Sequence, residues 1–250
     1  MGVIEEIRDK SGTTHYLYDM WETTRKRCSY TNEKTGFPSV NLLAGDMNKI
    51  YDGCVPGGLK DYFKLISGTC PCNCPGCYAK KITRNYEPAI KFAANTIEAK
   101  TDPEKFWYLV DRELYEWNRF VIYKIVRIHD SGDYFSDDYF RYGMKFIKSH
   151  RETTRFYGYT KADEIVDNYG IGNIPDNMNL LCSPWGDISK PIGNLPQFIY
   201  DDGSDPDLVK IPHCPAIDSR GKKTGVQCKD CCWCPLYAKK GCKKAVYAHK

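Results

Sequence analysis

Several common sequence signals are missing from this chain of 250 residues, and each absence excludes a class of protein. No apolar run approaches the roughly 20 residues that a membrane-spanning helix needs. Residues 1–16 mix acidic and basic side chains and lack the apolar centre of a secretory signal. We therefore expect a cytoplasmic protein with no membrane partner.

The motifs of the common nucleotide-binding and hydrolytic enzymes are also missing. The chain has no P-loop, no G-x-G-x-x-G dinucleotide fingerprint and no nucleophile elbow. A metal centre built on histidine would need distant partners, because the five histidines are scattered: His15, His129, His150, His213 and His249. Those enzyme classes are therefore not indicated.

Charge is moderate but uneven. The net charge is +4 and 27% of the residues are charged, which is ordinary for a globular protein and does not by itself imply nucleic acid. Residues 221–250 nevertheless set eight lysines against one acid, Asp230; the lysines are Lys222, Lys223, Lys229, Lys239, Lys240, Lys243, Lys244 and Lys250. Such a tail either binds phosphate, for example of a nucleic acid, or forms a solvated basic surface.

Cysteine is the residue in excess. Thirteen cysteines would suit a small disulfide-rich secreted protein, but this chain is too long and has no export signal. Ten of the thirteen fall in two groups, Cys70 to Cys77 and Cys214 to Cys242. In a reducing compartment, clustered thiols are typical of metal or redox sites. The two groups are therefore the candidate metal sites.

The middle of the chain alternates between two kinds of apolar pattern. Strands are expected at 62–66, 120–128, 155–159, 178–182 and 197–200, and helices at 78–100, 103–118, 137–148 and 161–168. Asp102 and Ser136 are suitable N-caps for two of these helices. This alternation predicts an α/β fold with a parallel sheet. Four or five units are too few for a closed eight-stranded barrel, so a partial barrel or an open doubly wound sheet is expected.

Three segments follow from these patterns. Residues 1–60 are expected to be an irregular N-terminal segment, 61–205 an α/β core, and 206–250 a cysteine-rich metal-binding tail.

The first cysteine group lies between a predicted strand and a predicted helix. Cys70, Cys74 and Cys77 have the spacing C-x3-C-x2-C. Three thiolates on one loop can hold three irons of a 4Fe-4S cluster and leave the fourth iron open to a small molecule. Parallel α/β folds place their active sites at the carboxyl edge of the sheet, where this loop is expected. These three cysteines are therefore the predicted catalytic and metal-binding residues.

The stretch from Gly68 to Ala79 resembles the cluster-binding loop of the radical S-adenosylmethionine (SAM) superfamily. The resemblance implies a partial (β/α) barrel of the radical SAM type with a cysteine-rich C-terminal appendage. It implies reductive cleavage of SAM to a 5′-deoxyadenosyl radical that modifies a substrate: a peptide, a nucleobase or a small metabolite. It also implies an electron donor such as flavodoxin or ferredoxin.

Two positions in this loop depart from the usual pattern of that superfamily. The aromatic residue usually found just before the third cysteine is replaced by Gly76, and the aromatic Tyr78 follows instead as the candidate SAM contact. Cys72 is an additional thiol, which allows the alternative C-x-C-x-C-x2-C with four ligands. Four ligands would close the site and indicate a structural zinc or an electron-transfer cluster.

The turn at 129–133 follows the second strand predicted in the core. The resemblance implies contacts to SAM at this place, and Asp130, Ser131, Gly132 and Asp133 supply small residues and carboxylates that can accept from its ammonium group. The alternative is a hydrogen-bonded turn with a helix cap. Ser183, which follows the strand predicted at 178–182, is a further candidate contact to the cofactor.

The second cysteine group indicates another metal site. Cys228, Cys231 and Cys234 form C-x2-C-x2-C, which is similar to the start of a bacterial ferredoxin motif, and Cys214 or Cys242 can supply a fourth ligand. An auxiliary iron–sulfur cluster and a structural zinc knuckle both fit this pattern. Zinc knuckles also bind single-stranded nucleic acid, which the neighbouring lysines would favour.

Most of the chain, from Asn32 through 129–133 to the last cysteines, also resembles the phage "gene product eighty-eight" family. A phage origin would place the protein in the host cytoplasm. The main functional hypothesis is a radical SAM enzyme. The alternative is a non-catalytic zinc or iron–sulfur protein that binds nucleic acid through its basic tail.

Overall fold

The computed structural model describes eleven parts of the chain: residues 6–8, 14–16, 26–29, 36–45, 68–72, 74, 77, 79, 86–118, 124–185 and 189–247. The strand predicted at 62–66 and the candidate SAM contact Tyr78 lie outside these residues. None of the described helices is both long and apolar enough to cross a membrane. A short hairpin of β1 (Glu6–Arg8) and β2 (Thr14–Tyr16) stands apart from the main sheet.

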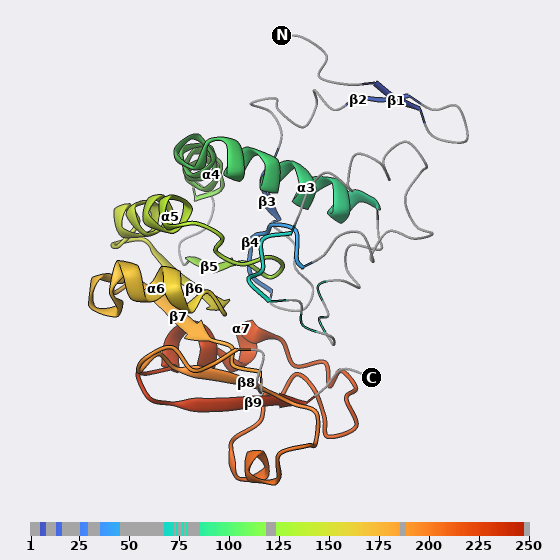
Figure 1. The fold of residues 1–250 in the computed structure, drawn as a ribbon, viewed down its shortest axis with the longest axis vertical. Coiled ribbons are helices and arrows are strands. Elements are labelled where there is room, and N and C mark those ends of the chain that lie inside the picture. The colour runs from blue at the N-terminus through green and yellow to red at the C-terminus, as the bar shows by residue number, and fades with distance from the viewer. Residues whose placement is uncertain are drawn as a thin grey trace.

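The main sheet has seven strands, which stand side by side in the order of the sequence (Figure 1). They are β3 (Cys28–Ser29), β4 (Ser39–Val40), β5 (Lys124–Ile128), β6 (Thr154–Thr160), β7 (Met178–Cys182), β8 (Gln197–Asp201) and β9 (Lys243–Tyr247). The pair β3–β4 is antiparallel and all other neighbours are parallel. The sheet is not closed, because β3 and β9 form its two edges. The predicted α/β class with a mostly parallel sheet is therefore confirmed.

Five α-helices are described, and two of them have the N-caps that the sequence predicts. They are α3 (Tyr86–Thr101), α4 (Pro103–Asn118), α5 (Asp137–Ser149), α6 (Asp163–Tyr169) and α7 (Cys228–Cys231). The carboxylate of Asp102 accepts from the backbone N–H of Lys105 at 2.9 Å, and the hydroxyl of Ser136 accepts from that of Tyr139 at 3.2 Å. Both N-caps are those predicted, because an oxygen near the backbone satisfies N–H groups that the first helical turn leaves unpaired.

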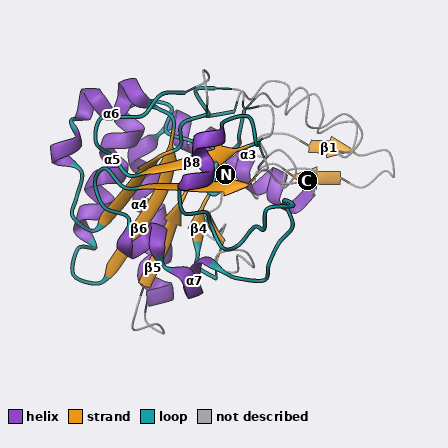
Figure 2. Ribbon diagram, turned by 90° about the horizontal axis from the view of Figure 1, so that it is seen from below, coloured by secondary structure: helices purple, strands orange, loops and turns teal. Residues whose placement is uncertain are grey.

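Alternate side chains of the strands face two different layers. Val126, Phe156 and Leu180 belong to the large core that also contains Phe106 of α4 and Phe140 of α5. This core fills the space between the sheet and the helices α4, α5 and α6. Figure 2 shows the strands from below, with α5 and α6 at one side of the sheet. The two layers arise because successive side chains of a strand point to opposite faces of the sheet.

The opposite face of the sheet is covered by the cysteine-rich tail. Tyr157 of β6 and Leu181 of β7 are buried against Cys234 and Ala238. The side chain of Asn179 also donates to the backbone oxygen of Cys234 at 2.7 Å. The tail that the sequence predicts as an appendage contributes β9 to the sheet as well, since Lys243–Tyr247 pairs with β8 over five residues. The cysteine-rich tail is thus built into the core.

A buried ion-pair cluster joins the start of the sheet to two helices. The side chain of Arg27 is 1% exposed and donates to both carboxylate oxygens of Glu98 in α3, each at 2.8 Å. It also donates to Glu113 in α4 at 3.0 Å, and Glu113 accepts from the backbone N–H groups of Arg27 and Cys28. Bidentate pairing of this kind compensates the cost of burying the charges.

Replacing Arg27 with Met is expected to lower the free energy of unfolding by about 3–5 kcal/mol, because it leaves two carboxylates in a buried site without their cation. Urea unfolding followed by circular dichroism measures the change. The matched control is Arg151→Met, which removes the exposed pair with Asp176 and should cost less than about 1 kcal/mol. Equal losses in the two variants would contradict this account of Arg27.

Candidate functional site

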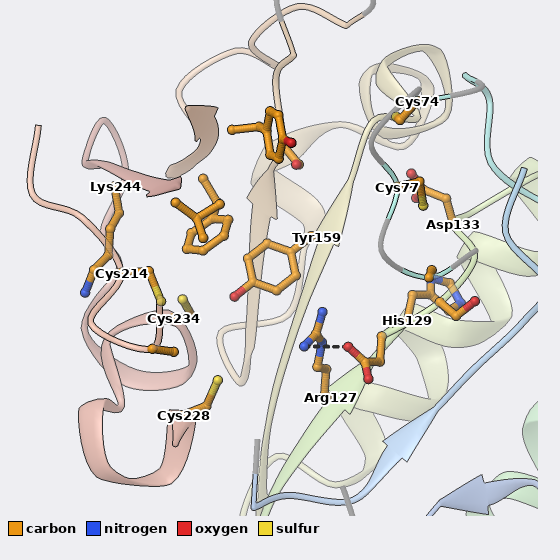
Figure 3. A pocket seen from close by; sticks show the side chains of 18 of the residues that line it. Cys74, Cys77, Arg127, His129, Asp133, Tyr159, Cys214, Cys228, Cys234 and Lys244 are labelled. Atoms are coloured by element: carbon orange, nitrogen blue, oxygen red, sulfur yellow. Dashed lines mark ion pairs between the residues drawn. The ribbon is translucent and has the colours of Figure 1, made fainter. Parts of the chain in front are cut away.

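One cavity lies where the carboxyl ends of the strands meet the cysteine-rich tail (Figure 3). The empty volume of the cavity is about 1460 Å³, which includes the part that opens to solvent. Its lining comes from the turns after β4, β5 and β7, from the end of β6, from β8 and β9, and from both cysteine groups. Ligand sites of α/β proteins are found at this edge of a parallel sheet.

The first cysteine group is fixed to the sheet through Thr69. The backbone N–H and the hydroxyl of Thr69 both donate to the carbonyl of Leu43, at 2.9 and 3.0 Å. The same hydroxyl accepts from the backbone N–H of Asp133 at 2.9 Å. Gly132 has a φ of +84°, and a Cβ there would lie 2.7 Å from the hydroxyl of Thr69 and 2.7 Å from Leu42. The turn after β5 and the cysteine segment can therefore approach only with glycine at 132.

The thiols of the first group face the cavity in a partly buried setting. Cys70, Cys72, Cys74 and Cys77 all line it, and the sulfurs of Cys72 and Cys74 are 3.7 Å apart. Burial raises the pKa of the Cys70 thiol to about 12, and the nearby carboxylate of Asp133 acts in the same direction. A protonated thiol must lose its proton to bind a metal, so metal binding at this site would release protons.

The two carboxylates of the turn at 129–133 have different partners. Asp133 is buried and accepts from the backbone N–H groups of Tyr134 and Lys161, each at 2.8 Å, and from the hydroxyl of Thr160 at 2.7 Å. Burial raises its pKa, and the bonds from Lys161 and Thr160 oppose that shift. Asp133 thereby ties the turn to the end of β6. Asp130 instead pairs with Arg127 at 2.7 Å on the cavity wall.

His129 and Ser131 line the cavity, and each carries a buried polar atom that has no hydrogen-bond partner among the described residues. His129 is 3% exposed and has a φ of +59°, which is uncommon outside glycine. Its Nε2 lies 3.0 Å from the hydroxyl of Tyr139, whereas its Nδ1 has no hydrogen-bond partner among the described residues. Burial, aided by the charge of Arg127, lowers its pKa to about 3, so the ring is neutral. The hydroxyl of Ser131 is likewise buried without a described partner.

A lysine stands beside the candidate contact Ser183. The ammonium of Lys161 donates to the hydroxyl of Ser183 at 3.2 Å and lies 6.0 Å from the ring centre of Trp185. All three side chains line the cavity. The positive charge of Lys161 also lowers the pKa of Cys70 against the larger effect of burial. This corner of the cavity therefore offers a cation, a hydroxyl and an aromatic ring close to the first cysteine group.

The second cysteine group forms the opposite wall. In Figure 3, Cys214, Cys228 and Cys234 lie on one side of Tyr159 and Arg127, and Cys74 and Cys77 lie on the other. The side chains of the second group that line the cavity are those of Cys214, Cys228, Cys231 and Cys234. Burial raises the pKa of the Cys234 thiol to about 12, and a hydrogen bond with Tyr159 opposes this shift.

The donor chemistry of both groups suits iron–sulfur or zinc binding, because thiolates are the preferred ligands of both. Within the described residues, however, no three His, Cys, Asp or Glu side chains meet around a single ion position. A cubane cluster distributes its thiolates over separate irons, one to each, so it does not need that convergence. The cysteines therefore fit iron–sulfur or zinc binding in the chemistry of their thiols.

The structure brings nearly all the predicted site residues to this one cavity. They are Cys70, Cys74, Cys77, Asp130, Ser131, Gly132, Asp133 and Ser183, together with the four tail cysteines Cys214, Cys228, Cys231 and Cys234. Tyr78 lies outside the described residues. Two cations of the cavity, Arg127 and Lys161, were not identified from the sequence, and the third, Lys244, was identified only as one of the lysines of the basic tail. A charged residue within or next to a mostly apolar strand is the signal that could have found them.

The match to a known protein family covers most of the chain. The family described as Gene product 88 matches residues 31–248, a range that includes both cysteine groups and the turn at 129–133. No curated protein and no solved structure matches the chain. The extent of the family match, on a fold with both cysteine groups at one cavity, shows that the chain belongs to the Gene product 88 family.

Proposed function

We propose that this protein is a radical SAM enzyme that holds a 4Fe-4S cluster on Cys70, Cys74 and Cys77. The observation that carries the proposal is the location of these thiols at the carboxyl edge of a parallel sheet, on the wall of a large cavity. Three ligands leave one iron open, which is typical of a catalytic centre. When bound, the cluster supplies one electron to SAM, which separates into methionine and a 5′-deoxyadenosyl radical.

The sheet topology supports the finer proposal of a partial barrel. Parallel strands that stand in sequence order, with the helices α4, α5 and α6 packed on one face, are typical of part of a (β/α) barrel. A doubly wound sheet would instead reverse its strand order at a switch point. In this proposal the face away from the helices is the inside of the partial barrel, and the tail fills it.

The polar residues of the cavity suit the groups that SAM presents. The ammonium of Lys161 and the hydroxyl of Ser183 can bind a carboxylate. The hydroxyl of Ser131, which has no partner among the described residues, can accept from an ammonium or bind a ribose. Asp130 adds a carboxylate that Arg127 orients. Asp133 acts as a positioning residue, because its oxygens already accept three hydrogen bonds within the protein.

The remaining partners follow from the same proposal. Flavodoxin or ferredoxin would supply the electron, and the substrate would be a peptide, a nucleobase or a small metabolite that gives a hydrogen atom to the radical and yields 5′-deoxyadenosine. The reaction would take place in the cytoplasm, that of the host if the protein is phage-encoded.

A second candidate function is a non-catalytic zinc or iron–sulfur protein that binds nucleic acid. Two observations favour it. The 3.7 Å between the sulfurs of Cys72 and Cys74 is close to the roughly 3.8 Å that Zn–S bonds of about 2.3 Å give in a tetrahedral site. The tail also carries exposed lysines, among them Lys222, Lys223, Lys239, Lys240 and Lys243, which suit phosphate binding.

Anaerobically reconstituted protein is expected to show an iron–sulfur absorption band and, with dithionite and SAM, to form 5′-deoxyadenosine. Cys70→Ala should reduce that product to background, because it removes one of three cluster ligands. Cys242→Ala is the matched control, since this exposed cysteine does not line the cavity. Liquid chromatography with mass detection measures the product. Colourless, zinc-loaded protein that leaves SAM intact would contradict the proposal.

The ligand count is tested by Cys72→Ala. If three thiolates hold the cluster and leave one iron open, this variant retains its absorption band and its SAM cleavage. Iron and sulfide analysis beside the absorption spectrum provides the measurement. Loss of the cluster in this variant would mean that four thiolates close the site, as the second candidate function requires.

Gly132→Ala is expected to lower the iron content at the first cysteine group. The added methyl group would press on Thr69 and Leu42 and displace the segment that carries Cys70. Gly203→Ala is the matched control, because Gly203 also has a positive φ, +87°, but no atom lies within 4 Å of the added Cβ. Both changes should cost about 1 kcal/mol of stability through backbone strain, and only the first should lower iron. Equal iron in both variants would disprove the role given to this contact.

A further inference from the structure

The tail holds six cysteines, and their surroundings separate them into two sets. Cys214, Cys228, Cys231 and Cys234 line the cavity. Cys232 turns away, since its backbone is left-handed at φ +50° and its sulfur donates to the carbonyl of Lys229 at 2.9 Å. Cys242 is exposed and does not line the cavity. Four thiols are therefore gathered on one wall, which is the number that a closed metal centre uses.

Pairing with β9 explains why Cys214, which is far from the others in sequence, belongs to this set. The segment that carries it runs beside β9 through a bridge between His213 and Ala245. The backbone N–H of Cys214 donates to the carbonyl of Ala245 at 2.7 Å. The same strand carries Lys244 towards the cysteines, as Figure 3 shows. One strand thus positions both a candidate ligand and a cation.

Lys244 brings a positive charge against this wall of cysteines. Lys244 is only 8% exposed. Its ammonium lies 3.6 Å from the sulfur of Cys231 and 5.0 Å from the ring centre of Trp233. No carboxylate among the described residues forms an ion pair with it. A buried ammonium is costly unless an anion lies beside it. Metal-bound thiolates supply that anion, because four of them outweigh the charge of a divalent ion or of a 4Fe-4S core.

We propose that Cys214, Cys228, Cys231 and Cys234 bind a second 4Fe-4S cluster, with Lys244 beside the thiolate of Cys231. A cluster is favoured over zinc because Cys228, Cys231 and Cys234 have the spacing C-x2-C-x2-C, which is similar to the start of a bacterial ferredoxin motif. Four protein ligands leave no iron open, so this centre exchanges electrons and does not bind substrate. The proposal depends on the tail alone and does not require SAM cleavage at the first group.

The test uses the full chain with the first group removed, Cys70→Ala/Cys74→Ala/Cys77→Ala, so that failure at either centre is seen separately. After anaerobic reconstitution this variant should hold about four irons per chain and show a cluster signal in electron paramagnetic resonance on reduction. Adding Cys214→Ala or Cys231→Ala should abolish both. Adding Cys232→Ala or Cys242→Ala, the matched controls, should change neither. One zinc and no iron per chain, or loss of iron with Cys242→Ala but not with Cys214→Ala, would overturn the proposal.

The role of Lys244 can be tested through the reduction potential of the tail centre, which a purely structural role would not change. A cation beside a cluster thiolate stabilises the reduced, more negative state, so Lys244→Met should shift the reduction potential of the tail centre to more negative values. Lys244→Arg keeps the charge and should keep the potential closer to that of the parent, and Lys243→Met changes an exposed neighbour and should leave it unchanged. Redox titration followed by paramagnetic resonance measures this. Equal potentials in Lys244→Met and Lys243→Met would disprove the assigned role.

Discussion

The hydrogen bonds of Thr69 hold the first cysteine group against the sheet, and the geometry of the whole cavity depends on them. One hydroxyl links the carbonyl of Leu43 after β4 to the backbone of Asp133 after β5. Asp133 extends the connection to the end of β6 through Thr160 and Lys161. Three neighbouring strand ends and the cysteine segment therefore form one connected unit, which fits a site whose ligands must be held in fixed relative positions.

Charge balance is the second constraint on this cavity. Eight thiols, two carboxylates and a neutral histidine share it with three cations, Arg127, Lys161 and Lys244. Burial keeps Cys70 and Cys234 protonated near neutral pH, since it raises the pKa of each to about 12. Metal binding changes this state, because it replaces thiol protons by metal charge. In the proposed metal-bound state, the lysines beside each cysteine group would face anionic sulfur, which would offset the cost of burying their charge.

The sequence predicted those elements whose signal is local. The strand at 178–182 and the helix at 103–118 were found with their observed bounds, because an apolar run, an Asp N-cap and a following proline act over a few residues. The strand β9 was missed, since Lys243–Tyr247 is short, begins with two lysines and is defined by its pairing with β8. For the same reason the tail was expected as an appendage and not as part of the sheet.

The sequence by itself determined that the protein has an α/β fold and two groups of clustered thiols, because hydrophobic periodicity and cysteine spacing are local properties of the chain. Only the tertiary structure decided that both groups border one cavity, with Tyr159 and Arg127 between them. It also separated Cys232 and Cys242 from the other tail cysteines and placed Lys244 beside Cys231. These relations join residues that are from 13 to more than a hundred positions apart, or distinguish adjacent ones. Strand pairing and burial create them, and no local pattern encodes either.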